Sequence, residues 1–147
     1  DIPDERMAEE FPGIPNHPAW TLSHLWLSSA FVLKLLGVDT TPPDDAESRE
    51  AMARFGPGSI PVPDASAYEK RDPLLSRLES LHMQVDNAVR ERHAEYFEKP
   101  SPEFLRQFSP TLGRIVLYLI TAHESYHLGQ LVLWKKAAGI QKAMVNG

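Results

Sequence analysis

The chain has 147 residues, 42% of them hydrophobic and 24% charged, which is the size and composition of one globular domain. Its formal net charge of −5 and pI of about 5.6 argue against a nucleic-acid binder, because there is no basic stripe to meet phosphates. The lack of cysteine excludes disulfides and protein thiolate chemistry, so any metal ion must be held by imidazole or carboxylate groups.

The first predicted helix runs from about residue 18 to residue 36. Pro18 is favourable at its first position, because the N–H group that proline lacks would have no partner there. Hydrophobic residues then recur at helical spacing, and Gly37 marks the end. Only fifteen residues precede Asn16, and residues 4 to 10 are predicted to form about two helical turns.

A long connector follows, which covers about residues 38 to 71 and is rich in proline. Residues 45 to 55 within it are predicted to form a short amphipathic helix, whereas residues 56 to 63 contain too much proline and glycine for regular structure. A connector of this length in a compact domain is either functional itself or a cover over a site.

Two further long helices are predicted, one from Pro73 into the low nineties and one from about Pro110 to Ala138. The last helix is hydrophobic almost all round, so we expect it at the centre of the fold. Between them lie residues 93 to 108, whose second half is predicted to form a helical turn or two. With no strand pattern and no internal repeat, the chain is predicted to be all-α, a single up-down helical bundle over residues 1–147.

Six histidines are present, and three of them have ordinary explanations. His17 beside a helix start and His93 in a charged stretch are expected to be solvated, and His82 lies at the edge of the second helix's hydrophobic stripe. His123 and His127 are four residues apart in the last helix, so both rings lie on one face about one turn apart. A shared cation would satisfy their ring nitrogens in this hydrophobic helix, although such a pair also arises by chance.

The pair belongs to the string H-E-S-Y-H, which matches the zinc-protease pattern H-E-x-x-H. A ligand count excludes a protease of this kind, because no His, Asp or Glu occurs from Leu128 to the end of the chain. The third ligand must come from upstream, and His24 is the best candidate, since it lies on the hydrophobic side of the first helix. Three neutral imidazoles would leave coordination positions open for water or substrate, as in a catalytic site.

The strings N-H-P-A-W-T-L-S-H-L at residues 16–25 and H-E-S-Y-H-L-G-Q-L at residues 123–131 resemble the DinB-like (YfiT-like) metalloprotein superfamily. The resemblance covers most of the chain and implies a four-helix bundle with a three-histidine metal site. Carried over motif by motif, the ligands would be His24, His123 and His127. The family has a full helix before the first motif, whereas this chain has room for less, so we expect the first bundle helix to be short or missing.

Some members of this superfamily are transferases or isomerases that use low-molecular-weight thiols, so the resemblance implies a metal-dependent thiol transferase. The same open site could instead activate water for hydrolysis. Three residues are weak candidates for catalytic roles: Glu124 as a base or ion-pair partner, and Tyr126 and Gln130 for lining the pocket or orienting a ligand. Each could equally be a packing or solvated residue. The alternative function is a non-catalytic bundle whose histidines only pack and whose face serves dimerisation.

Three imidazoles plus water suit nickel or zinc best, with iron as a further choice. The expected partners are a small-molecule substrate, such as a low-molecular-weight thiol, and a second copy of the chain, because the hydrophobic helices are one covering helix short. Neither nucleic acid nor a membrane is expected, since no hydrophobic run is long enough to span a bilayer. The lack of cysteine is typical of the reducing cytoplasm, which is the expected location.

Overall fold

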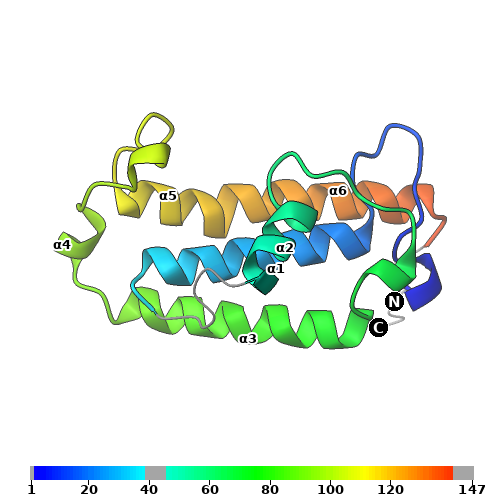
Figure 1. Ribbon diagram of the computed structural model, residues 1–147, viewed down its shortest axis with the longest axis horizontal. Coiled ribbons are helices and arrows are strands. Elements are labelled where there is room, and N and C mark those ends of the chain that lie inside the picture. The colour runs from blue at the N-terminus through cyan, green and yellow to red at the C-terminus, as the bar shows by residue number, and fades with distance from the viewer. Residues whose placement is uncertain (1, 39–45, 141–147) are drawn as a thin grey trace, which may run out of the picture.

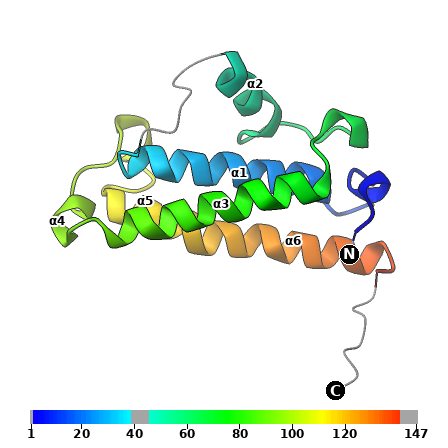
Figure 2. The same ribbon diagram turned by 90° about the horizontal axis from the view of Figure 1, so that it is seen from below.

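The computed structural model describes residues 2–38 and 46–140. Three long rods of helix lie side by side in it, as Figures 1 and 2 show. They are α1 (Pro18–Leu35), α3 (Arg71–Arg90) and a last rod composed of α5 (Leu112–Tyr118), a π-helical segment (Leu119–His123) and α6 (Glu124–Ala137). The described residues contain no β-strand, only an isolated bridge between Pro100 and Thr111, so the all-α prediction is confirmed.

Shorter helical elements connect the rods. The helix predicted inside the long connector is confirmed as α2 (Ala46–Phe55), which packs against α1. The other short elements are η1 (Asp4–Arg6), η2 (Ala65–Ala67), α4 (Ala94–Phe97) and η3 (Glu103–Leu105), the last of which is the turn predicted in the second connector. Within the described chain, no helix has the length and hydrophobicity that crossing a membrane requires.

The helix ends follow local chemistry. α1 begins at Pro18 as predicted and ends before Gly37, whose φ of +71° is left-handed backbone that glycine adopts without strain. α3 begins two residues before the predicted Pro73, so this proline lies in the first turn of the helix. It breaks no hydrogen bond there, because the first four N–H groups of a helix have no partner inside it. α5 begins two residues after the predicted Pro110, because the Pro110 carbonyl accepts a hydrogen bond from the Ser101 backbone N–H (3.1 Å).

The core lies on both halves of α1, so α1 is the central rod. Its C-terminal half packs against α3 and α5, and its N-terminal half packs against α3 and the segment around Met7. Val32, Leu33 and Leu36 are at most 1% exposed. Burial of each such side chain contributes roughly 1.5–3 kcal/mol. These contacts fix α1 against the last rod, and the candidate site lies along the same seam.

The last rod is not central, and the sequence prediction was wrong on this point. Its outer face carries large hydrophobic side chains that are more than half exposed: Leu117, Tyr126, Leu128, Val132 and Leu133. A fourth long rod would cover this face, but before α1 the described chain forms only η1 and irregular turns. The two turns predicted at residues 4 to 10 are thus reduced to one, in agreement with a short first helix.

Candidate metal centre

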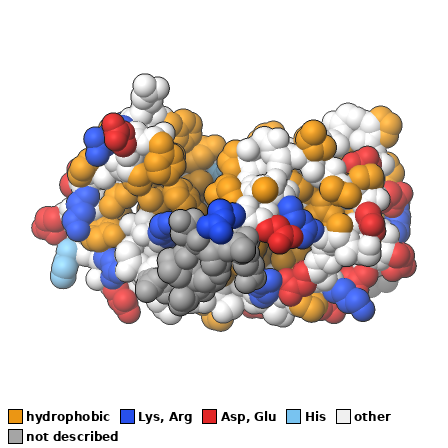
Figure 3. All heavy atoms as spheres, in the orientation of Figure 1, with side chains coloured by type: hydrophobic (Ala, Val, Ile, Leu, Met, Phe, Trp, Pro, Cys, Tyr) orange, Lys and Arg blue, Asp and Glu red, His pale blue; other side chains and the backbone are white. Residues whose placement is uncertain are grey.

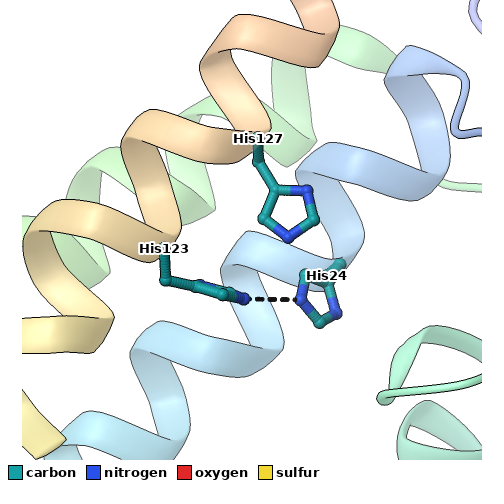
Figure 4. Close-up of side chains that lie close together, drawn as sticks. All are labelled: His24, His123 and His127. Atoms are coloured by element: carbon teal, nitrogen blue, oxygen red, sulfur yellow. Dashed lines mark hydrogen bonds between the residues drawn. The ribbon is translucent and has the colours of Figure 1, made fainter. Parts of the chain in front are cut away.

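Three histidine rings meet on the seam between α1 and the last rod (Figure 4). His24 comes from α1, His123 ends the π segment, and His127 lies in the first turn of α6. One ring nitrogen of each lies within 4.8 Å of the other two, and the Nε2 atoms of His24 and His123 are 3.0 Å apart. Nitrogens bound to one tetrahedral zinc ion at about 2.0–2.1 Å lie roughly 3.4 Å from each other, so these rings are close to the spacing of a shared ion.

The π segment brings the two histidines of the last rod to the core side. His123 lies eight positions after the buried Ile115. In an uninterrupted α-helix, eight steps of about 100° would place His123 about 80° past Ile115 around the helix axis. A π turn takes up one more residue than an α turn, so the offset becomes about 20° in the other direction. His123 and His127 therefore share the face of Ile115 and point at α1. The π segment is absent from the sequence prediction, which has a continuous α-helix here.

A backbone carbonyl determines which nitrogen of His24 can bind an ion. The Phe55 carbonyl at the end of α2 lies 2.6 Å from Nδ1 of His24. Since a carbonyl only accepts, His24 donates its Nδ1–H there, and the neutral ring keeps a lone pair on Nε2, which faces His123. His24 is 6% exposed, and burial is the largest cause of its lowered pKa. The ring is therefore neutral and already oriented as a ligand.

A side-chain amide holds His127 in the same way. Oε1 of Gln130 lies 2.9 Å from Nδ1 of His127 and also accepts a hydrogen bond from Nδ2 of Asn16 at 3.0 Å. Because Asn16 donates to this oxygen, His127 also donates to it through Nδ1–H and presents Nε2 to the cluster. His127 is 5% exposed, and burial, followed by the neighbouring His24, lowers its pKa. Gln130 thus contacts a histidine of the cluster through its side-chain oxygen.

His123 is the partly exposed member of the cluster. Its Nδ1 is buried, and no group in the described part of the chain forms a hydrogen bond with it. Burial first, and then the neighbouring rings of His127 and His24, lowers the pKa of His123 from 6.5 to about 4. All three rings are therefore neutral at pH 7, which is the form that binds a metal ion. Because the other two residues are almost fully buried, His123 is the member of the cluster nearest to solvent.

The long connector closes the site from the side of α2. Trp20, one turn before His24 on α1, stacks on the His24 ring with centroids 4.8 Å apart and planes 8° from parallel. Its indole N–H donates to the Arg54 carbonyl and to the Ser59 hydroxyl, each at 3.1 Å. With the Phe55 carbonyl, these contacts attach the end of α2 to the site. The connector is thus a cover over a site, one of the two roles that its length indicated.

The other residues singled out in the sequence lie in different surroundings. Glu124 reaches α3, where its carboxylate lies 2.8 Å from Nε2 of His82. Tyr126 is 63% exposed, and its ring stands edge-on to that of His127 with centroids 5.2 Å apart. His93 is exposed, as expected. Of the three weak catalytic candidates, the hydrogen-bonded contact to a site histidine comes from Gln130.

His17 contradicts the expectation of a solvated ring, because it is only 1% exposed. Its Nδ1 accepts a hydrogen bond from the Trp20 backbone N–H (3.2 Å) and so caps α1, while its Nε2–H donates to the Val62 carbonyl (3.0 Å). The sequence analysis missed this role because histidine is not among the usual capping residues. The signal that was available is its position directly before Pro18, at the start of the helix.

Comparison with known protein families gives a match. The family model described as the DinB superfamily matches residues 1–131, which is most of the chain and includes all three site histidines. No curated protein and no solved structure matches the chain. The match therefore agrees with the resemblance that the two histidine motifs carry and with the helical fold.

Proposed function

The chain belongs to the DinB superfamily, and from this premise we propose that it is a metal-dependent enzyme. One divalent ion would be held by His24, His123 and His127, which offer ring nitrogens within 4.8 Å of one another. The observation that carries the proposal is the fixed orientation of two rings. Phe55 and Gln130 each accept an Nδ1–H, which leaves Nε2 lone pairs directed into the cluster. Without an ion, the His24 lone pair accepts a hydrogen bond from Nε2–H of His123 at 3.0 Å, and a bound ion would replace that proton between the two rings.

The number of ligands supports catalysis rather than a structural role. Three imidazoles leave at least one coordination position open, whereas structural sites are closed by four protein ligands. A divalent ion in this site would lower the pKa of a bound thiol or water molecule and make it a nucleophile. Because His24 and His127 are buried, a substrate would approach over His123.

The direction of Glu124 favours thiol transfer over hydrolysis. Hydrolysis on an H-E-x-x-H helix uses the glutamate as the general base for water. Here the Glu124 carboxylate lies 2.8 Å from His82 on α3. A thiol on the ion needs no such base, since its unperturbed pKa of about 8.5 is already far below that of water. The proposed reaction is the transfer of a low-molecular-weight thiol to an electrophilic small molecule, with metal-dependent hydrolysis as the second candidate.

Elemental analysis of protein purified without an affinity tag tests the metal site. We propose zinc or nickel, with iron as the third choice, at about one equivalent per chain. His127→Ala should lose the ion, and the matched control His93→Ala, which removes an exposed histidine, should keep it. A content below about a tenth of an equivalent, or one unchanged by His127→Ala, would overturn the proposal in favour of a non-catalytic bundle with packed histidines.

The catalytic part of the proposal needs a separate measurement. The metal-loaded protein is assayed for consumption of a low-molecular-weight thiol in the presence of a panel of electrophiles. Turnover should require the ion and fall at least about a hundredfold in His127→Ala, while His93→Ala retains it. Release of hydrolysis products without thiol consumption would replace the transferase by the second candidate. Turnover that survives metal removal would contradict both.

A further inference from the structure

The solvent side of the metal centre has an aromatic border. The ring of Tyr118 lies 6.0 Å from that of His123, measured between centroids. Phe108 packs edge-on against Tyr118 at 5.1 Å, and Phe104 lies 6.4 Å from Phe31 of α1. We call Phe31, Phe104, Phe108 and Tyr118 the aromatic wall. Its rings form two pairs, Phe31 with Phe104 and Phe108 with Tyr118, and Tyr118 is the member beside the partly exposed site histidine.

Most of the aromatic wall is exposed. Phe104 is 74% exposed, Phe108 is 63% exposed and Tyr118 is 39% exposed. The connector with η3 folds back over α5 (Figure 1), and hydrophobic side chains gather over α5 in the space-filling view, where part of a histidine is visible beside them (Figure 3). Exposed hydrophobic side chains that collect beside a functional site mark a binding surface.

Contacts besides those of the two exposed phenylalanines also anchor this connector. Leu105, between them in sequence, packs against the core instead. The Leu105 carbonyl accepts hydrogen bonds from the backbone N–H groups of Phe108 (3.0 Å) and Ser109 (2.7 Å). The backbone is therefore held by its own bonds and by one core residue. Phe104 and Phe108 are presented to solvent from a fixed position, which is how a preformed binding surface is built.

The chemistry of the wall defines what it would bind. None of its four side chains carries a charge, and apart from the Tyr118 hydroxyl they offer only aromatic faces and edges. Their faces and edges favour another ring, in stacked or edge-to-face packing. We propose that the aromatic wall binds an aromatic group of the small-molecule substrate whose donor atom occupies the open coordination position beside His123. This inference rests on the proposed function, because it requires an ion in the site.

Protein loaded with Co²⁺ in place of its own ion allows a direct test, because thiolate binding changes the visible absorption of the cobalt. The two probes are phenylmethanethiol and ethanethiol, and the measured quantity is the ratio of their Kd values. In the unmodified protein phenylmethanethiol should bind about tenfold more tightly. In Phe108→Ala and in Phe104→Ala that preference should fall to about twofold, while the Kd of ethanethiol stays the same.

Two controls accompany the test. Met83→Ala removes a side chain that is 60% exposed on α3, so it tests the loss of hydrophobic surface elsewhere and should leave the preference unchanged. The Co²⁺ stoichiometry and the helical circular dichroism of each variant show whether the fold and the site are intact. Because Phe104 and Phe108 are exposed and outside the core, both variants should remain folded.

The outcomes separate the two proposals. If the protein takes up no Co²⁺, the proposed function fails, and the inference about the wall fails with it. If both thiols change the spectrum and the Phe104→Ala and Phe108→Ala variants keep the full preference, the wall does not bind substrate and only this inference is overturned. If Phe108→Ala instead changes the mass of the particle measured by light scattering, the wall is a contact between copies of the chain, which also overturns it.

Discussion

The carboxylate of Glu124 lies 2.8 Å from Nε2 of His82, although Glu124 directly follows a site histidine in sequence. Successive residues of an α-helix point about 100° apart, so Glu124 leaves the face that the site histidines share and reaches α3 instead. The side chains of the pair are 45% exposed for His82 and 24% exposed for Glu124. The contact ties the last rod to α3.

Removing this pair should affect stability slightly and metal binding not at all. We expect Glu124→Gln and His82→Gln each to lower the free energy of unfolding by about 0.2–1 kcal/mol, as is usual for partly exposed pairs. Urea unfolding of both single variants and the double variant gives the coupling between the two residues. Metal content measured in parallel should stay at its original value. Loss of the ion in Glu124→Gln would show that this carboxylate belongs to the site.

Replacing Gln130 should weaken metal binding without removing a ligand. In Gln130→Leu the Nδ1–H of His127 loses its acceptor, so the ring is no longer held with Nε2 toward the cluster. Loss of such an orienting contact typically lowers metal affinity about 10–100-fold. Competition with a chromophoric chelator measures the change. The matched control is Gln84→Leu, which replaces an exposed glutamine whose side-chain amide bonds to Ser80 of the same helix, α3. The metal affinity of this variant should equal that of the unmodified protein.

The metal-free protein should lose stability as the pH falls from about 6.5 to about 4. In the unfolded chain a histidine titrates near its ordinary pKa of about 6.5, whereas burial and the neighbouring rings lower the pKa of His123 to about 4 in the folded state. Between these values the unfolded state binds more protons, so the free energy of unfolding falls with decreasing pH, and above about pH 6.5 this contribution is constant.

Urea unfolding of chelator-treated protein at about pH 7.5 and about pH 4.5 checks this pH dependence. His123→Gln has no such titrating group at this position, so its loss of stability between the two pH values should be smaller. An equal loss in both proteins would show that groups other than His123 carry the pH dependence and would contradict this prediction.

Replacing His17, the buried cap of α1, should lower stability more than replacing His93, an exposed histidine that also precedes a helix. His17→Ala removes the hydrogen bonds to the Trp20 N–H and the Val62 carbonyl, and we expect a loss of about 1–2 kcal/mol in the free energy of unfolding. His93 also precedes a helix, α4, but makes no capping bond with its side chain. Thermal unfolding of His93→Ala should therefore match the original protein, and equal effects of the two variants would refute the capping role.

Much of the secondary structure could be predicted because its signals are local. Hydrophobic spacing together with Pro18 and Gly37 predicted α1. The amphipathic pattern of residues 45–55 predicted α2. The start of α5 could not be predicted in this way, because it depends on a hydrogen bond between Ser101 and the Pro110 carbonyl. The exposure of the last rod was also missed, since a hydrophobic helix indicates burial only if another element is present to cover it.

The candidate site likewise combines features that local sequence spacing predicts with features that depend on tertiary contacts. That His123 and His127 share a helix face could be predicted from their spacing of four residues, which helix geometry places on one side. The sequence also pointed to His24 as the third ring, but the contact itself depends on tertiary packing and on a π segment that brings His123 and His127 onto the face toward α1. The tertiary structure also decided which nitrogens face the cluster, because the Phe55 carbonyl and the Gln130 amide reach the rings only when distant segments have packed together.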